Sequence, residues 1–134
     1  MGEVYVRVRL SNAGDVERVS QGLSTMDQVR SCEVDALVDT GSTRSAIPQE
    51  IAERLGLALV DNVFGRLADG SHVSVGVCGA IRFEIMGRRT SEEANVMGDE
   101  ILIGQTVLEA TDLLVDCKNQ KVIAKHPEGP IFRF

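Results

Sequence analysis

The chain has 134 residues, a net charge of −6, and 43% hydrophobic but only 4% aromatic residues. This length is typical of one domain, and the sequence holds no run approaching the roughly 18 apolar residues that a membrane-spanning helix needs. Because nucleic-acid surfaces neutralise phosphates with Lys and Arg, the acidic balance argues against a nucleic-acid partner, and the absence of a signal-like N-terminal segment favours a cytoplasmic protein without a membrane partner.

The cysteines and histidines do not form a metal-ligand motif. Cys32, Cys78 and Cys117 are odd in number and never occur as C-x-x-C, so the sequence indicates neither a disulfide framework nor a zinc site. Only His72 and His126 could assist them. We therefore expect no metal.

Short strand-like runs separated by turn residues make up most of the sequence. Residues 4–10 alternate apolar and polar side chains, which predicts a half-buried strand, and residues 11–15 then predict a turn. Residues 16–30 show a mixed pattern. Residues 31–38 predict the next strand, whose last three residues are all apolar, as in a strand buried on both faces.

The strongest helix signal covers residues 48–56. Pro48 suits the first helical position, Ile51 and Leu55 share one face, and Gly56 suits the position just after the helix. Residues 106–110 favour a second short helix.

The remaining segments predict hairpins and one isolated apolar run. Strands over 59–67 and 72–85 are joined by Asp69-Gly70, a pair that favours a tight turn because both residues tolerate positive φ. Met86-Gly87-Arg88 predicts a further turn before a strand near 94–97. Residues 101–104 are an apolar run ending in Gly, and residues 113–117 and 121–124 predict a terminal hairpin. Together, these segments predict an all-β domain with one or two short helices.

A carboxylate follows the buried end of the strand over 31–38. Burying Asp39 is costly unless its charge is hydrogen-bonded or paired. Thr40 offers a hydroxyl group, and Gly41 lets the backbone approach the carboxylate closely. The loop is therefore suited to hold one acid in place, although a D-T-G sequence also occurs in ordinary Asx-type turns.

These features resemble the retropepsin-like aspartic proteases, the single-lobe family that includes the retroviral proteases, and particularly its small bacterial members. The resemblance extends from about residue 32 to 124. It rests on residues 36–43, on the helical segment 48–57, on residues 67–71, and on residues 101–104 with Leu108 following.

The resemblance implies a fold and a set of site residues. It implies one domain over residues 1–134, folded as a closed β-barrel and acting as a C2 homodimer. It implies that Asp39 is catalytic, that Thr40 hydrogen-bonds to the partner's loop, and that Gly41 lies close to the substrate. The flap over the substrate would consist of Leu67, Ala68, Asp69, Gly70 and Ser71. The resemblance implies no metal and no cofactor.

The chemistry implied for Asp39 sets the stoichiometry. Two carboxylates must share one proton, and this chain has a single D-T-G, so a second copy is expected to supply the other acid. The terminal segments 4–10 and 131–134 are candidates for strands that interleave across the two-fold axis.

We therefore expect a homodimeric aspartic endopeptidase that hydrolyses a peptide or protein substrate with activated water. Two alternatives stay open: a dimeric peptide-binding module of the same fold with weak or no turnover, and a β-barrel of another function with a chance D-T-G. His72 and His126 are expected to be exposed. Asp35, Asp112 and Asp116 are expected at the surface or in turns, and Arg66 suits either substrate contact or a surface salt bridge.

Overall fold

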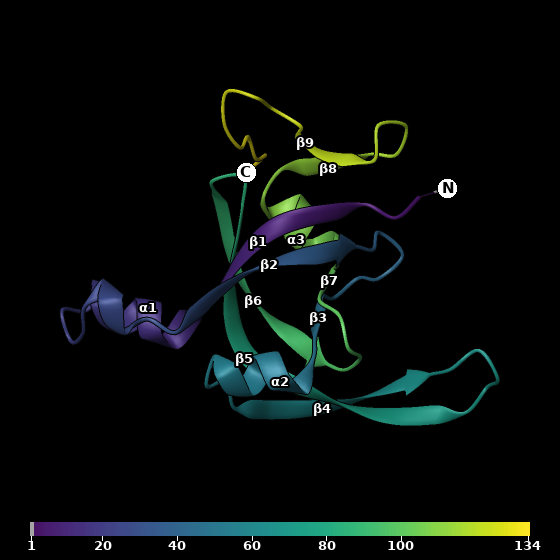
Figure 1. Cartoon of the computed structure of the whole chain (residues 1–134), viewed down its shortest axis with the longest axis horizontal. Coiled ribbons are helices and arrows are strands. Elements are labelled where there is room, and N and C mark those ends of the chain that lie inside the picture. Colours follow the sequence, from purple (N-terminus) through teal and green to yellow (C-terminus); the bar gives the residue numbers. More distant parts are fainter. Residues whose placement is uncertain (1) are drawn as a thin grey trace.

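The computed structural model describes residues 2–134 and consists mainly of β-strands (Figure 1). The strands are β1 (Tyr5–Asn12), β2 (Ser31–Val38), β3 (Ala46–Ile47), β4 (Leu59–Arg66), β5 (His72–Ile85), β6 (Arg88–Val96), β7 (Leu102–Ile103), β8 (Leu113–Asp116) and β9 (Lys121–Ala124). The helices are α1 (Ala13–Ser20), the 3-10 turn η1 (Met26–Gln28), α2 (Gln49–Arg54) and α3 (Gln105–Ala110). The mainly β class is confirmed, but over residues 2–134 the helices outnumber the expected one or two.

Seven strands form one sheet in the order β1-β2-β7-β3-β6-β5-β4, and β1 also pairs with β5. The short strand β7 runs parallel to β2 on one side and antiparallel to β3 on the other. A segment from late in the chain is thus inserted between two earlier strands. β8 and β9 form a separate antiparallel pair.

The hydrophobic core is built from alternate residues of the long strands. Residues Val8, Leu10, Ile81, Phe83 and Ile85 are almost fully buried. Their neighbours along the strands point outward, as the two-residue period of a strand requires. Helices α2 and α3 add Ala52, Val107 and Leu108 to the same core.

The chain between β1 and β2 differs from the predicted turn and mixed segment. Asn12 ends β1 and caps helix α1, because its Oδ1 accepts a hydrogen bond from the Asp15 N–H at 3.0 Å. Its Nδ2 donates to the Leu55 carbonyl at 2.9 Å. Asp15 in turn binds the Arg30 guanidinium through both carboxylate oxygens, each at 2.9 Å. Asparagine favours turns and helix caps alike, which is why the sequence suggested a turn.

Helix α2 forms almost as predicted. Gly56 follows it with a φ of +66°, the left-handed conformation expected just after a helix end. Pro48 caps the helix instead of occupying its first position. No helix within residues 2–134 is long and apolar enough to cross a bilayer.

The hairpin of β4 and β5 forms, but its turn differs from the prediction. The Gly70 N–H donates to the Leu67 carbonyl at 2.9 Å, and the Leu67 N–H donates to the Ser71 carbonyl at 2.8 Å. Gly70 has a φ of +87°, whereas Asp69 does not have a positive φ. A three-residue loop with Gly in the left-handed position therefore replaces the expected two-residue turn.

The next hairpin turn is confirmed, with a longer second strand. Met86 and Gly87 both have positive φ, 53° and 75°, and β6 then begins at Arg88. The predicted strand near residues 94–97 is only the end of β6.

Asp112 lies in a turn, as one of the two expectations had it, but it is buried, and His126 is half-buried instead of fully exposed. Asp112 is only 6% exposed, and its Oδ2 lies 2.6 Å from His126 Nδ1 and 3.6 Å from Arg88 Nη1. Arg88 Nη1 also donates to the Asp112 carbonyl at 2.9 Å. These partners lie far from Asp112 in sequence, so local pattern could not reveal the cluster.

Candidate active site

The loop that carries Asp39 begins where β2 ends, and backbone hydrogen bonds hold that end from two directions. The Val38 N–H donates to the Val4 carbonyl at 2.8 Å, and the Asp39 N–H donates to the Ile103 carbonyl at 2.9 Å. The N-terminal segment and β7 thus both contact the end of β2. The backbone position of Asp39 is fixed by the sheet.

The carboxylate of Asp39 is oriented by its own loop. Its Oδ1 accepts a hydrogen bond from the Gly41 N–H at 3.0 Å. A Cβ at position 41 would lie 3.3 Å from the same oxygen, closer than ordinary packing allows. Asp39 is half-buried, while Thr40 and Gly41 are exposed. The sequence expectation that this loop orients one acid agrees with this geometry.

The far side of the loop is held by helix α3. The first N–H groups of a helix have no partner within the helix. Here the Gln105 N–H donates to the Ser42 carbonyl at 2.8 Å, and the Thr106 N–H donates to the Thr43 carbonyl at 3.1 Å. The loop carbonyls therefore accept the N–H groups at the start of α3 that have no partner within the helix, and the same hydrogen bonds hold the loop in place.

Ser45 is a supporting residue that the sequence reasoning missed. Its side chain is fully buried, and its Oγ accepts a hydrogen bond from the Gly104 N–H at 2.8 Å. A polar residue directly before the apolar pair Ala46-Ile47 was the available signal. Nothing local identified its partner 59 residues away.

Position 104 requires glycine because there is no space for a side chain, and its backbone conformation is one that any residue can adopt. Its φ of −86° is ordinary, but a Cβ there would lie 2.7 Å from the Arg44 carbonyl carbon and 2.9 Å from the Ser45 nitrogen. The apolar run ending in Gly104 thus passes directly against the Asp39 loop.

The five residues expected to form the flap, Leu67 to Ser71, make up the exposed turn between β4 and β5. Asp69 Oδ1 accepts hydrogen bonds from the Ser71 hydroxyl at 2.6 Å and the Ser71 N–H at 2.9 Å. Both bonds lower the pKa of Asp69 below its ordinary value, and the bond from the hydroxyl has the larger effect.

The hairpin extends away from the body of the molecule, on the same side as the loop after β2 (Figure 1). Over residues 2–134, no hydrogen bond or ion pair joins the turn to residues 39–41. The structure therefore places the two groups on one side without bringing them into contact.

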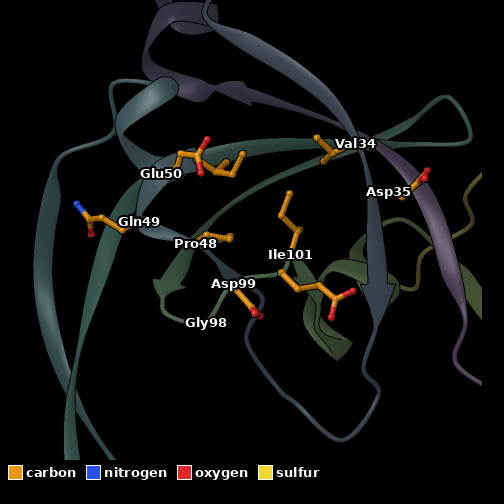
Figure 2. Close-up of a pocket in the computed structure, with 10 residues that line it drawn as sticks. Val34, Asp35, Pro48, Gln49, Glu50, Gly98, Asp99 and Ile101 are labelled. Atoms are coloured by element: carbon orange, nitrogen blue, oxygen red, sulfur yellow. The ribbon is translucent and has the colours of Figure 1, made fainter.

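A cavity of about 510 Å³ lies apart from Asp39, between β2, the first turn of α2 and the residues that precede β7 (Figure 2). Val34, Ile51 and Ile101 contribute apolar side chains to it, and four residues contribute carboxylates: Asp35, Glu50, Asp99 and Glu100. Within the described chain, no group of three or more His, Cys, Asp or Glu side chains is arranged to hold a metal ion.

Comparisons with known proteins match this geometry. A family model described as aspartyl protease matches residues 25–107, a range that includes the Asp39 loop, the exposed hairpin and β7. The fold is similar to that of the retroviral protease-like domain of Ddi1 from Leishmania major. That match has a TM-score of 0.54 and 22% identity, and covers 92% of this chain and 85% of the other. No curated protein matches the sequence closely enough to count as a relative.

Proposed function

Because this chain belongs to the aspartyl protease family, we propose that it is a homodimeric aspartic endopeptidase in which each copy contributes one Asp39. The observation that carries the proposal is the position of Asp39: it lies at the end of β2, oriented by the Gly41 N–H and held by β7. β1 pairs with both β2 and β5, and we propose that this double pairing closes the sheet into the barrel of one lobe. We also propose that the enzyme acts in the cytoplasm.

The proposed dimer follows from the number of acids. The chain contains a single D-T-G, whereas the reaction needs two carboxylates close together. At a separation of about 3 Å two carboxylates cannot both ionise readily, so the pair holds one proton between them. The exposed Thr40 side chain is free to hydrogen-bond to the loop of the second copy.

The two carboxylates would have different roles in each turnover. The ionised one takes a proton from water as the water oxygen bonds to the carbonyl carbon of the scissile peptide. The protonated one donates its proton to the carbonyl oxygen, which gives a tetrahedral diol. Collapse of the diol breaks the C–N bond, and a carboxyl group returns a proton to the departing nitrogen.

The proposed substrate is an extended peptide or protein segment. It would lie between Asp39 and the turn Leu67–Ser71, with its backbone pairing along strand edges and its side chains entering alternate pockets. β4 is the last strand of the sheet order, so one of its edges is unpaired within the chain.

The test compares Asp39→Asn with the wild type on a peptide library and on a denatured protein. The matched control is Asp35→Asn, which removes an exposed carboxylate from the same strand, one that pairs with Arg7 at 3.5 Å. We expect Asp39→Asn to lower kcat/KM by about 100-fold or more, as loss of a general acid–base group does, and the control to keep its activity. Equal cleavage by wild type and Asp39→Asn would contradict the proposal, as would a strictly monomeric active enzyme in sedimentation.

The hydrogen bonds at the hairpin tip favour a second candidate function. Asp69 and Ser71 bridge this turn, and Gly70 is its only glycine, so the tip is more constrained than a glycine-rich turn. A constrained flap suits a dimeric module that binds peptides with little turnover. Peptide binding that survives Asp39→Ala, without cleavage by the wild type from pH 4 to 8, would favour this candidate.

A further inference from the structure

The outward faces of β1, β5 and β6 carry a group of arginines in two adjacent rows. In the first row the cross-strand register places Glu84 between Arg9 and Arg89. In the second row it places Arg82 between Ser11 and Ser91. Directly opposed residues of antiparallel strands point to the same face, so the three guanidinium groups lie on one side of the sheet.

Positive charge on this face is only partly compensated. Arg9 lies 3.6 Å from Glu33 and donates to the Ser31 hydroxyl at 3.3 Å. Among the ion pairs formed by residues 2–134, none includes Arg82 or Arg89. The three arginines are thus faced by two glutamates, Glu33 and Glu84, which leaves one positive charge uncompensated in a chain whose net charge is −6.

The segment that contains α1 and η1, residues 13–28, covers this face and leaves a cavity of about 280 Å³ beneath it. Val16 of α1, together with Met26 and Val29 at η1, forms the apolar part of the wall. Arg82 is half-buried there, and Ser11 is 6% exposed. Partial removal from water raises the cost of a guanidinium that has no counter-charge, so an anion in the cavity would be stabilised.

We propose that this cavity binds a small oxyanion, the phosphate group of free phosphate or of a small phosphomonoester. Three guanidinium groups and two carboxylates leave one positive charge, which the anion would offset. Arginine binds phosphate oxygens through two parallel hydrogen bonds, and the Ser11 hydroxyl lies in the same lining. The volume is at the lower end for small-molecule sites, which favours a small ligand over a macromolecular segment. The site lies on another face from Asp39 and does not depend on the proposed proteolysis.

Calorimetric titration with inorganic phosphate and with glycerol phosphate tests the site, using chloride at matched ionic strength as the control. We expect saturable binding of phosphate or phosphomonoester by the wild type, and at least tenfold weaker binding by Arg82→Met. Arg54→Met, which removes an exposed arginine at the end of α2, should bind as the wild type does. Tighter binding of glycerol phosphate than of phosphate would identify an organic phosphomonoester as the ligand, whereas equal affinities would identify free phosphate.

A variant that removes a negative charge from the cavity provides a second test. Glu84→Gln removes the one carboxylate of the cavity, so it should tighten phosphate binding several-fold. If Arg82→Met fails to fold, Arg89→Met serves in its place, and amide NMR shifts of Ser11 and Arg82 on titration locate the ligand. The proposal is overturned by no saturable binding or by unchanged affinity in both arginine variants.

Discussion

The buried hydroxyl of Ser45 accepts the N–H of Gly104 at 2.8 Å, and this bond joins the Asp39 loop to the segment between β7 and α3. The two residues are 59 positions apart. The loop is thus supported by a part of the chain that local sequence does not connect to it.

Removing that bond should destabilise the fold. Ser45→Ala leaves a buried N–H without a partner, which costs about 1–3 kcal/mol of unfolding free energy. Gly104→Ala should cost at least as much, because its Cβ would lie within 3 Å of the Arg44 and Ser45 backbone. Urea denaturation measures both, and Ser74→Ala on the exposed part of β5 is the control. A Ser45→Ala variant as stable as this control would contradict the assigned role.

Asn12 should be sensitive to substitution for two separable reasons. Its Oδ1 caps α1, and its Nδ2 donates to the Leu55 carbonyl at 2.9 Å. Asn12→Ala loses both bonds, and loss of the cap alone costs about 1 kcal/mol. Asn12→Ser keeps a cap acceptor without placing a charged oxygen against the Leu55 carbonyl, so it should lose less stability. Chemical denaturation ranks the variants against Asn62→Ala on exposed β4, and a Ser variant no better than Ala would show that the cap contributes nothing.

The turn at the hairpin tip should respond to backbone strain at Gly70. Alanine is strained at its φ of +87°, at a cost of roughly 1–2 kcal/mol. Gly22→Ala is the matched control, because its φ is +75° and it likewise has nothing within 4 Å of the added Cβ. Both variants should lose similar stability, but only Gly70→Ala should weaken peptide binding, measured by fluorescence anisotropy. Equal peptide affinity in the two variants would show that the turn does not take part in substrate binding.

The same turn should depend on pH through Asp69. Hydrogen bonds from the Ser71 hydroxyl and N–H hold the pKa of Asp69 below its ordinary value in the folded turn. A lowered folded-state pKa means that the contribution of these bonds is present above the ordinary pKa and is lost as pH falls through the folded-state pKa. The protection of the Ser71 amide, measured as its exchange rate relative to that of an unstructured peptide at the same pH, should therefore fall in acid, and Asp69→Asn should remove most of that pH dependence.

The cluster of Arg88, Asp112 and His126 should order the C-terminal segment. Burial alone would raise the pKa of Asp112. The hydrogen bonds from His126 and the Ile131 N–H, with the charges of His126 and Arg88, lower it below the ordinary value. The cluster's contribution is therefore present above the ordinary carboxyl pKa and is lost as pH falls through the lowered one. Amide protection over residues 125–131, measured relative to an unstructured peptide at the same pH, should fall in acid for the wild type and be low at all pH values for Asp112→Asn.

Lys121→Gln, an exposed change on β9, is the control for this cluster. His126→Gln retains hydrogen-bonding capacity but not a positive charge, so it should fall between wild type and Asp112→Asn. Slow exchange in Asp112→Asn would show that other contacts hold the segment.

Sequence alone predicted those parts of the fold that local chemistry determines. The apolar end of β2 followed by Asp39, and Gly56 after α2, each have a local cause and were predicted correctly. Helix α1 was missed because Gly14 lies in its first turn and Asn12 is compatible with a turn as well as with a cap.

The rest of the site depends on contacts between distant segments. Nothing near Ser45 indicates Gly104, and nothing near Asp112 indicates Arg88, since these pairs meet only after the sheet has formed. The insertion of β7 between β2 and β3 is likewise a property of topology. Such relationships come from packing that no window of neighbouring residues contains.

That insertion of β7 also sets an order of events in folding. β2 and β3 cannot reach their final spacing until residues 102–103 lie between them, and the Asp39 loop is not held on its far side until Gly104 to Thr106 arrive. Closing such long loops is slow and comes late in folding. A chain emerging from the ribosome therefore has to expose residues up to Thr106 before the Asp39 loop has all the backbone partners that hold it.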